Sequence, residues 1–175
     1  MMKIILLVVA LVIAGVLVYA ATRPDTFIVK RTAGVQAPPE KIFPLIDSLR
    51  AGERWSPYYR KDPAMQGTYG GPASGPGATF DFAGNKDVGS GRVSITGHSP
   101  PDKVTMRLQM FKPFAADNVV EFTLVPRGAA TEVTWSMQGR QPYVAKVMSV
   151  IFDMDKMIGK DFEAGLASLK TVAET

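Results

Sequence analysis

Side chains that could carry out chemistry are few in this chain of 175 residues. It contains one histidine, His98, and no cysteine. Without cysteine the chain cannot form a thiolate nucleophile, a disulfide framework or a cysteine-ligated metal site. With a single histidine, a catalytic triad or a multi-histidine metal site would need residues from another chain. The acidic residues are spread out, without the paired spacing typical of glycosidases or carboxylate metal sites.

His98 stands at the end of an expected strand, directly before Ser99-Pro100-Pro101. A catalytic imidazole needs a nucleophile to activate or a carboxylate to orient it. We interpret His98 as a histidine of a surface turn. The sequence therefore indicates no catalytic residue, no metal site and no cofactor.

Composition indicates a folded domain, because 46% of the residues are hydrophobic and 21% are charged. The net charge of +4 is mild. Nucleic-acid binding would require basic residues clustered on one face, so we expect no nucleic-acid partner.

The first residues differ from the rest. The segment Ile4–Ala21 is uncharged and nearly all aliphatic, and as a helix it would reach about 27 Å, close to the hydrocarbon thickness of a bilayer. A cleaved signal peptide is the alternative, since Val18-Tyr19-Ala20 resembles a cleavage site. Apolar cores of signal peptides usually run only about 7–15 residues, so we favour an uncleaved anchor over residues 1–23 and a domain over residues 24–175.

Orientation of this single-pass anchor is less determined. Lys3 favours a cytoplasmic amino terminus and an extracytoplasmic domain, although Arg23, Lys30 and Arg31 lie just beyond the other end.

After the anchor, apolar and polar residues alternate in short segments. The residues 27–35 predict a first strand, and six more strands are expected near 65–69, 78–82, 93–96, 104–110, 119–124 and 132–137. Alternation of this kind is typical of an antiparallel sheet with one buried face. Two short helices are expected between the first two strands, one opening at Pro38-Pro39-Glu40 and one running from about Asp47 to Arg54, because Pro44 should separate them.

Helical periodicity dominates the end of the chain. One stripe contains Val144, Met148, Ile151, Asp155, Ile158, Phe162, Leu166 and Leu169. This spacing predicts one long amphipathic helix. A sheet of about seven antiparallel strands closed by such a helix is an α+β architecture.

This order of elements, together with four short segments, resembles the SRPBCC (START/polyketide cyclase-like) superfamily over about residues 26–173. The segments are residues 37–43, Trp55-Ser56-Pro57-Tyr58, Gly75-Pro76-Gly77-Ala78 and residues 165–170. The resemblance implies a helix-grip fold, in which a curved sheet surrounds the C-terminal helix and leaves a hydrophobic cavity between them. It carries over no catalytic residue.

Ligand pockets of this kind are lined mainly by apolar side chains, with a few polar groups. The expected lining is Trp55, Tyr58, Phe80, Phe82, Met106, Leu108, Met110, Phe122, Trp135, Met137, Met148, Ile151 and Asp155. The same apolar residues would also be found in an ordinary core, and Met is often a filler there.

Two parts of this set have specific alternatives. Residues 55–59 would place aromatic rings either at the mouth of the cavity or in a turn packed on the sheet edge. Asp155 is the one charge on the face that should grip the sheet, so it would be either the polar end of the pocket or a hydrogen-bond partner at its rim.

These features predict a membrane-anchored protein that binds a hydrophobic small molecule or lipid without catalysis. One alternative is an enzyme of the polyketide cyclase/dehydratase type. Another is an accessory subunit of a larger membrane protein complex.

Overall fold

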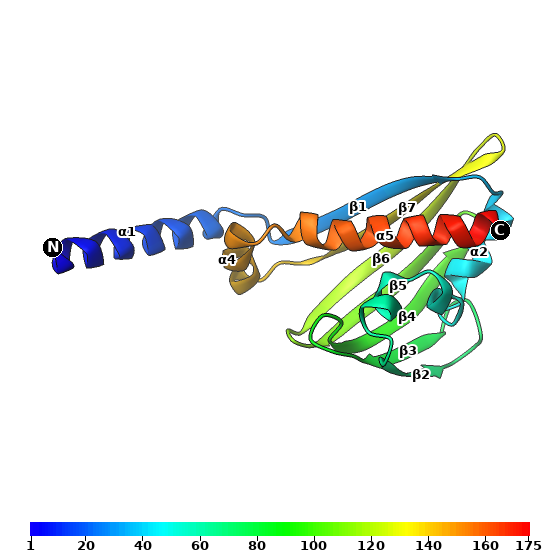
Figure 1. Cartoon of the computed structure of the whole chain (residues 1–175), viewed down its shortest axis with the longest axis horizontal. Helices are drawn as coiled ribbons and strands as arrows, with labels where there is room; N and C mark the ends of the chain where they lie inside the picture. Colours follow the sequence, from blue (N-terminus) through cyan, green and yellow to red (C-terminus); the bar gives the residue numbers. More distant parts are fainter.

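The computed structural model describes all 175 residues. The chain begins with a helix that projects from an α+β domain (Figure 1). Its elements are α1 (Met2–Ala21), β1 (Thr26–Val35), α2 (Pro39–Asp47), the 3₁₀ helix η1 (Ala51–Arg54), α3 (Pro57–Lys61), β2 (Gln66–Gly70), β3 (Thr79–Ala83), β4 (Ser90–Ser99), β5 (Lys103–Lys112), β6 (Ala116–Arg127), β7 (Ala130–Arg140), α4 (Tyr143–Ile151) and α5 (Met154–Glu174).

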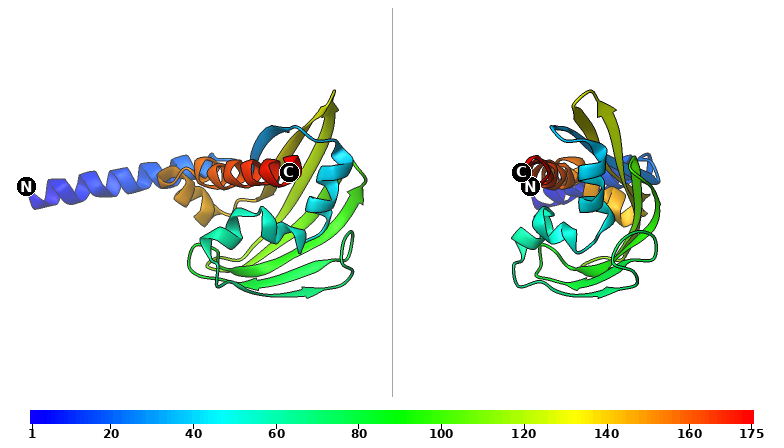
Figure 2. Two further views of the ribbon diagram at one scale, coloured as in Figure 1. Left: turned by 45° about the vertical axis from the view of Figure 1, so that its right-hand side comes forward. Right: turned by 90° about the vertical axis from the view of Figure 1, so that its right-hand side faces the viewer.

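The seven strands form one antiparallel sheet in the order β1-β7-β6-β5-β4-β3-β2. The sheet curves around α5, which lies on its concave side along the edge strand β1 (Figure 2). The predicted α+β class, the seven strands and the helix-grip arrangement are confirmed.

The alternation predicted along the strands is confirmed by their burial. Phe122 on β6 pairs with Trp135 on β7, and Val120 pairs with both Met137 and, on the other side, Met106. Because these residues share the concave face, they point toward α5.

The C-terminal part of α5 fills the concave face. Phe162, Leu166 and Leu169 are almost completely buried, and the Phe162 ring stacks on Trp135 with centroids 4.2 Å apart. Close approach is possible because α5 has a glycine at 165, where a Cβ atom would lie 2.6 Å from the Trp135 ring. This end of the domain is therefore a packed core.

The expectation of a single C-terminal helix is wrong. α4 ends at Ile151 and α5 starts at Met154. The side chain of Asp153 accepts a hydrogen bond from the backbone N–H of Lys156 and caps α5, which competes with continuation of α4 through this position. The apolar stripe is consequently divided between two helices.

The two predicted short helices are also revised. α2 continues through Pro44 to Asp47, because Ile42, Phe43 and Ile46 are buried in the core and tertiary packing stabilises so short a helix. The segment after it forms η1 and then α3.

Candidate functional site

Burial on the concave face changes along the strands. Val104, Leu124 and Val133 are at most 1% exposed, near the packed end. Toward the β5–β6 turn, Met106 and Met137 are 7% exposed and Leu108 is only half-buried. This less covered region, which we call the apolar floor, comprises Met106, Leu108, Met110, Val120 and Met137.

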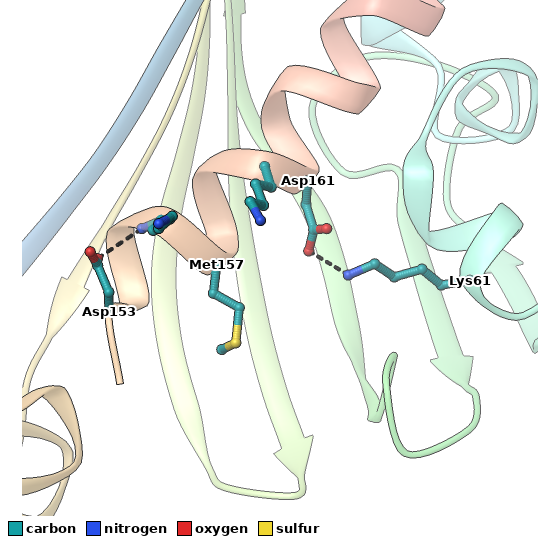
Figure 3. Close-up of a pocket in the computed structure, with 6 residues that line it drawn as sticks. Lys61, Asp153, Met157 and Asp161 are labelled. Atoms are coloured by element: carbon teal, nitrogen blue, oxygen red, sulfur yellow. Dashed lines mark hydrogen bonds and ion pairs between the residues drawn. The ribbon is translucent and has the colours of Figure 1, made fainter. Parts of the chain in front are cut away.

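An open groove of about 350 Å³ lies between α3 and the first half of α5 (Figure 3). It is lined by Lys61, Asp153, Lys156, Met157, Lys160 and Asp161. Lys61 Nζ and Asp161 Oδ2, 2.6 Å apart, connect the two helices across it. The groove therefore has a charged rim, in contrast to the apolar concave face.

The indole N–H of Trp135 is a polar group buried inside the domain. Its Nε1–H is buried and has no hydrogen-bond partner. An unsatisfied buried donor costs about 1–3 kcal/mol. Trp55, its neighbour in an edge-to-face ring contact, instead donates from Nε1 to the Leu45 carbonyl oxygen at 2.8 Å.

Asn118 is a second polar residue of the concave face, and sequence reasoning missed it. It is buried on β6 opposite Gly139, where a Cβ atom would lie only 2.0 Å from Asn118 Oδ1. Its amide makes no hydrogen bond to another side chain or to the backbone. The signal was available, because the inward alternation of Val120, Phe122 and Leu124 leads back to position 118.

The structure separates the thirteen predicted lining residues into groups. Those on strands share the concave face, as the alternation requires: Phe80, Phe82, Met106, Leu108, Met110, Phe122, Trp135 and Met137. Trp55 lies in the core and not at a mouth. Tyr58 on α3 is half-buried, and burial together with the negative charge of Asp161 raises the pKa of its hydroxyl, which stays neutral.

Met148 and Ile151 do not line the concave face. Both lie on α4 and are exposed. They were misplaced because the break at Asp153 turns α4 away from the axis of α5, and the helical stripe does not extend across it.

Of the two expected roles of Asp155, the structure supports the hydrogen-bond partner at the rim and not the polar end of a pocket. Its side chain is 59% exposed and binds the guanidinium of Arg31, with Oδ2 2.9 Å from Nη2. The hydrogen bond from Arg31 lowers the pKa of the Asp155 carboxyl. Together with Glu163, which binds Arg31 Nε at 2.8 Å, it connects α5 to the edge strand β1, where Arg31 pairs with Trp135.

His98 has a carboxylate partner, contrary to its interpretation as a simple turn residue. Its Nδ1 lies 2.9 Å from Asp47 Oδ1, and Asp47 is buried. Gly75, with φ of +78°, packs over the pair, since a Cβ atom there would be 3.0 Å from the imidazole. The pair connects α2 to the end of β4 that is remote from the β5–β6 turn. The sequence did not indicate this pair, because His98 and Asp47 are 51 residues apart in the chain.

Comparison with solved structures supports the fold. The chain is similar to the di-domain ARO/CYC BexL from the BE-7585A biosynthetic pathway, with a TM-score of 0.65, 14% identity, and coverage of 90% of this chain and 53% of that chain. It also resembles protein CV1439 from Chromobacterium violaceum, with a TM-score of 0.60, 14% identity and coverage of 87% and 99%. The Aha1 dimer from Colwellia psychrerythraea has a TM-score of 0.58, 18% identity and coverage of 85% and 96%.

No curated protein matches the chain in sequence. The model of one family, described as "Polyketide cyclase / dehydrase and lipid transport", matches residues 26–174. A curved antiparallel sheet around a C-terminal helix defines the helix-grip class. Within it, the chain belongs to the polyketide cyclase/dehydrase and lipid transport family.

Proposed function

We propose that this protein is a membrane-tethered binding protein for a hydrophobic small molecule or lipid, held between the concave face and the first half of α5. The family's description includes lipid transport. The apolar floor of the sheet and the charged groove between α3 and α5 suit a ligand with an apolar body and a polar end.

The buried Trp135 Nε1–H is the observation that carries the proposal. A donor without a partner in an apolar interior is stabilised when a ligand brings an acceptor oxygen to it. The ligand class is therefore an apolar molecule that bears a carbonyl or hydroxyl group.

Asn118 supplies a second polar contact. Trp135 pairs with Phe122, and the strand from Phe122 to Asn118 covers about 14 Å at about 3.4 Å per residue. Met137 and Val120 lie between these two polar positions. An elongated molecule with polar groups at separated positions matches this spacing.

The tether is α1, which is long and apolar enough to cross a membrane. A cleaved signal sequence has the same composition, but the packing of α4 against α1 favours a retained helix. Without α1, α4 would lose its main contact. The protein should therefore remain in the membrane fraction after carbonate washing; a soluble mature chain starting at Ala21 or later would contradict the tether.

Native mass spectrometry of the full chain from mild detergent tests ligand binding. The wild-type protein should carry an extractable apolar ligand, and Trp135→Phe, which keeps a ring but removes the donor, should retain about tenfold less of it. Trp55→Phe is the matched control, because it removes a donor that already has a protein acceptor.

Three results would each contradict one part of this proposal. Equal ligand retention by Trp135→Phe and wild type would show that the Trp135 Nε1–H does not bind the ligand. Conversion of the ligand to a product of different mass would indicate a cyclase or dehydratase. A stoichiometric protein partner in place of a ligand would indicate an accessory subunit.

A further inference from the structure

An apolar stripe on α4 is not covered by any part of the domain. Val144 and Ile151 are 71% and 67% exposed, and Met148 lies between them at helical spacing. Phe152 and Met154 extend the exposed apolar surface to the start of α5. A short helix that exposes so many large apolar side chains needs an apolar environment.

α4 lies beside the end of α1 (Figures 1 and 2). The Tyr143 hydroxyl donates to the Leu17 carbonyl oxygen at 2.8 Å, and Arg23 Nη2 donates to the Ser149 carbonyl oxygen at 3.4 Å. Leu17 belongs to the apolar segment that the tether would place in the bilayer. The contact therefore fixes α4 at the depth of the last turns of α1.

Charge on and near α4 also favours a lipid environment. α4 has no acidic residue, and its one charged side chain, Lys146, is buried with Nζ 2.5 Å from Asp25 Oδ1. Arg140 before α4 and Lys156 after it are exposed cations. Of the two intervening acids, Asp153 is occupied as the cap of α5 and Asp155 pairs with Arg31.

We propose that α4 lies in the headgroup–acyl boundary of the membrane that α1 spans, with Val144, Met148 and Ile151 directed into lipid. This inference rests on the tether of the proposed function. Lipid is the occupant that fits best, because the stripe continues the all-round apolar surface of α1, and because an aromatic residue, Tyr143, stands where interfacial aromatics gather.

A consequence concerns the groove. α5 follows α4 after two residues, Phe152 and Asp153, and Asp153 and Met157 line the groove. If α4 lies in the interface, the groove opens beside the lipid surface. A ligand would then pass between the bilayer and the concave face without crossing bulk water.

The absence of cysteine in the native chain allows single-site labelling. The full chain is reconstituted into vesicles of phosphatidylcholine and phosphatidylglycerol, with Val144→Cys or Ile151→Cys carrying an environment-sensitive fluorophore. Spin-labelled phosphatidylcholine should quench both labels at least threefold more than a label at Val119→Cys. Val119 is a matched control, being an exposed apolar residue on the outer face of β6.

A label at Leu7→Cys, in the middle of α1, distinguishes failure of this inference from failure of the tether. Quenching at Leu7 without quenching at Val144 and Ile151 would overturn the placement of α4 and leave the tether intact. Absence of quenching at Leu7 would overturn the tether and this inference with it. Labels on α4 that neither lipid nor aqueous iodide quenches would show that a second copy covers the stripe, which also overturns it.

Discussion

Two tryptophans in contact have opposite hydrogen-bonding states. Trp55 is satisfied by the Leu45 carbonyl, whereas Trp135 has no partner for Nε1. Strand alternation indicated Trp135 as apolar lining, whereas Trp55 was expected either at the mouth of the cavity or in a turn packed on the sheet edge. The sequence could not show which indole would lack an acceptor, since that depends on carbonyl groups brought close only by the fold.

Replacing each tryptophan by phenylalanine should also change the free energy of unfolding by different amounts. Trp55→Phe loses a satisfied hydrogen bond and should lower the free energy of unfolding by about 1 kcal/mol more than Trp135→Phe does. Both substitutions remove the same side-chain volume, so the destabilisation caused by the cavity largely cancels when the two variants are compared. Chemical denaturation of the ligand-free protein measures the difference, and equal losses would argue that Trp135 Nε1 has a partner.

Asp155 gives a prediction on pH. Its pKa is lowered by Arg31, so its contribution to stability is present above the unfolded-state pKa of about 3.9 and is lost as pH falls through the lower folded-state value. Because the side chain is 59% exposed, the contribution should be about 0.5 kcal/mol.

Asp155→Asn should therefore lower the free energy of unfolding slightly at neutral pH, and the difference from wild type should disappear at strongly acidic pH. Urea titrations at several pH values test this. Asp87→Asn serves as the control, since the Asp87 side chain makes no ion pair. A difference independent of pH would contradict the role of the ion pair.

At the scale of elements, the alternation of buried and exposed residues along each strand was predictable from the sequence. The positions at which the helices end were not. Periodicity predicts which side is buried, but Asp153 ends one amphipathic stripe and starts another by capping α5. A capping aspartate inside an uninterrupted apolar stripe is a weak local signal. Met148 and Ile151 were misplaced for this reason.

Glycines of α5 test how that helix contacts the rest of the domain. At Gly165 a Cβ atom would meet the Trp135 ring at 2.6 Å and Pro57 at 3.0 Å. Neither neighbour can move easily, so Gly165→Ala should lower stability by about 1–3 kcal/mol.

Gly159→Ala is the matched variant. Here the three atoms nearest to the added methyl all belong to the guanidinium of Arg31, the end of a flexible side chain. The better helix propensity of alanine, about 1 kcal/mol, offsets the loss. Thermal unfolding should show a clear decrease for Gly165→Ala and almost none for Gly159→Ala. Equal decreases would mean that α5 is held as tightly at its start as at its centre.

At the scale of the whole molecule, the N-terminal helix α1 packs mainly against α4 and makes few contacts with the rest of the domain. Residues 24–175 should fold without α1, because the hydrophobic core contains no residue of α1 or of α4. Circular dichroism of this fragment should show substantial β-structure.

Hydrogen exchange of the backbone amides of this fragment should show which residues lose protection when α1 is removed. Residues 143–151 should exchange at least tenfold faster than in the full chain, whereas β6 and the centre of α5 should be unchanged, since α4 alone loses its packing partner and its hydrogen bonds to Leu17 and Arg23. Unchanged protection of α4 would show that the domain itself holds it.

The connection between α1 and β1 is short, because only Thr22–Asp25 separate the two elements. Fully extended, such a segment reaches about 14 Å, far less than the width of an aqueous compartment. If α1 is the membrane tether proposed above, a domain with so little slack is confined to a thin layer over its own bilayer and does not reach another membrane. Ligand exchange then becomes a two-dimensional encounter, and its rate should follow the density of protein and ligand per unit of membrane area, not their concentration in the surrounding solution.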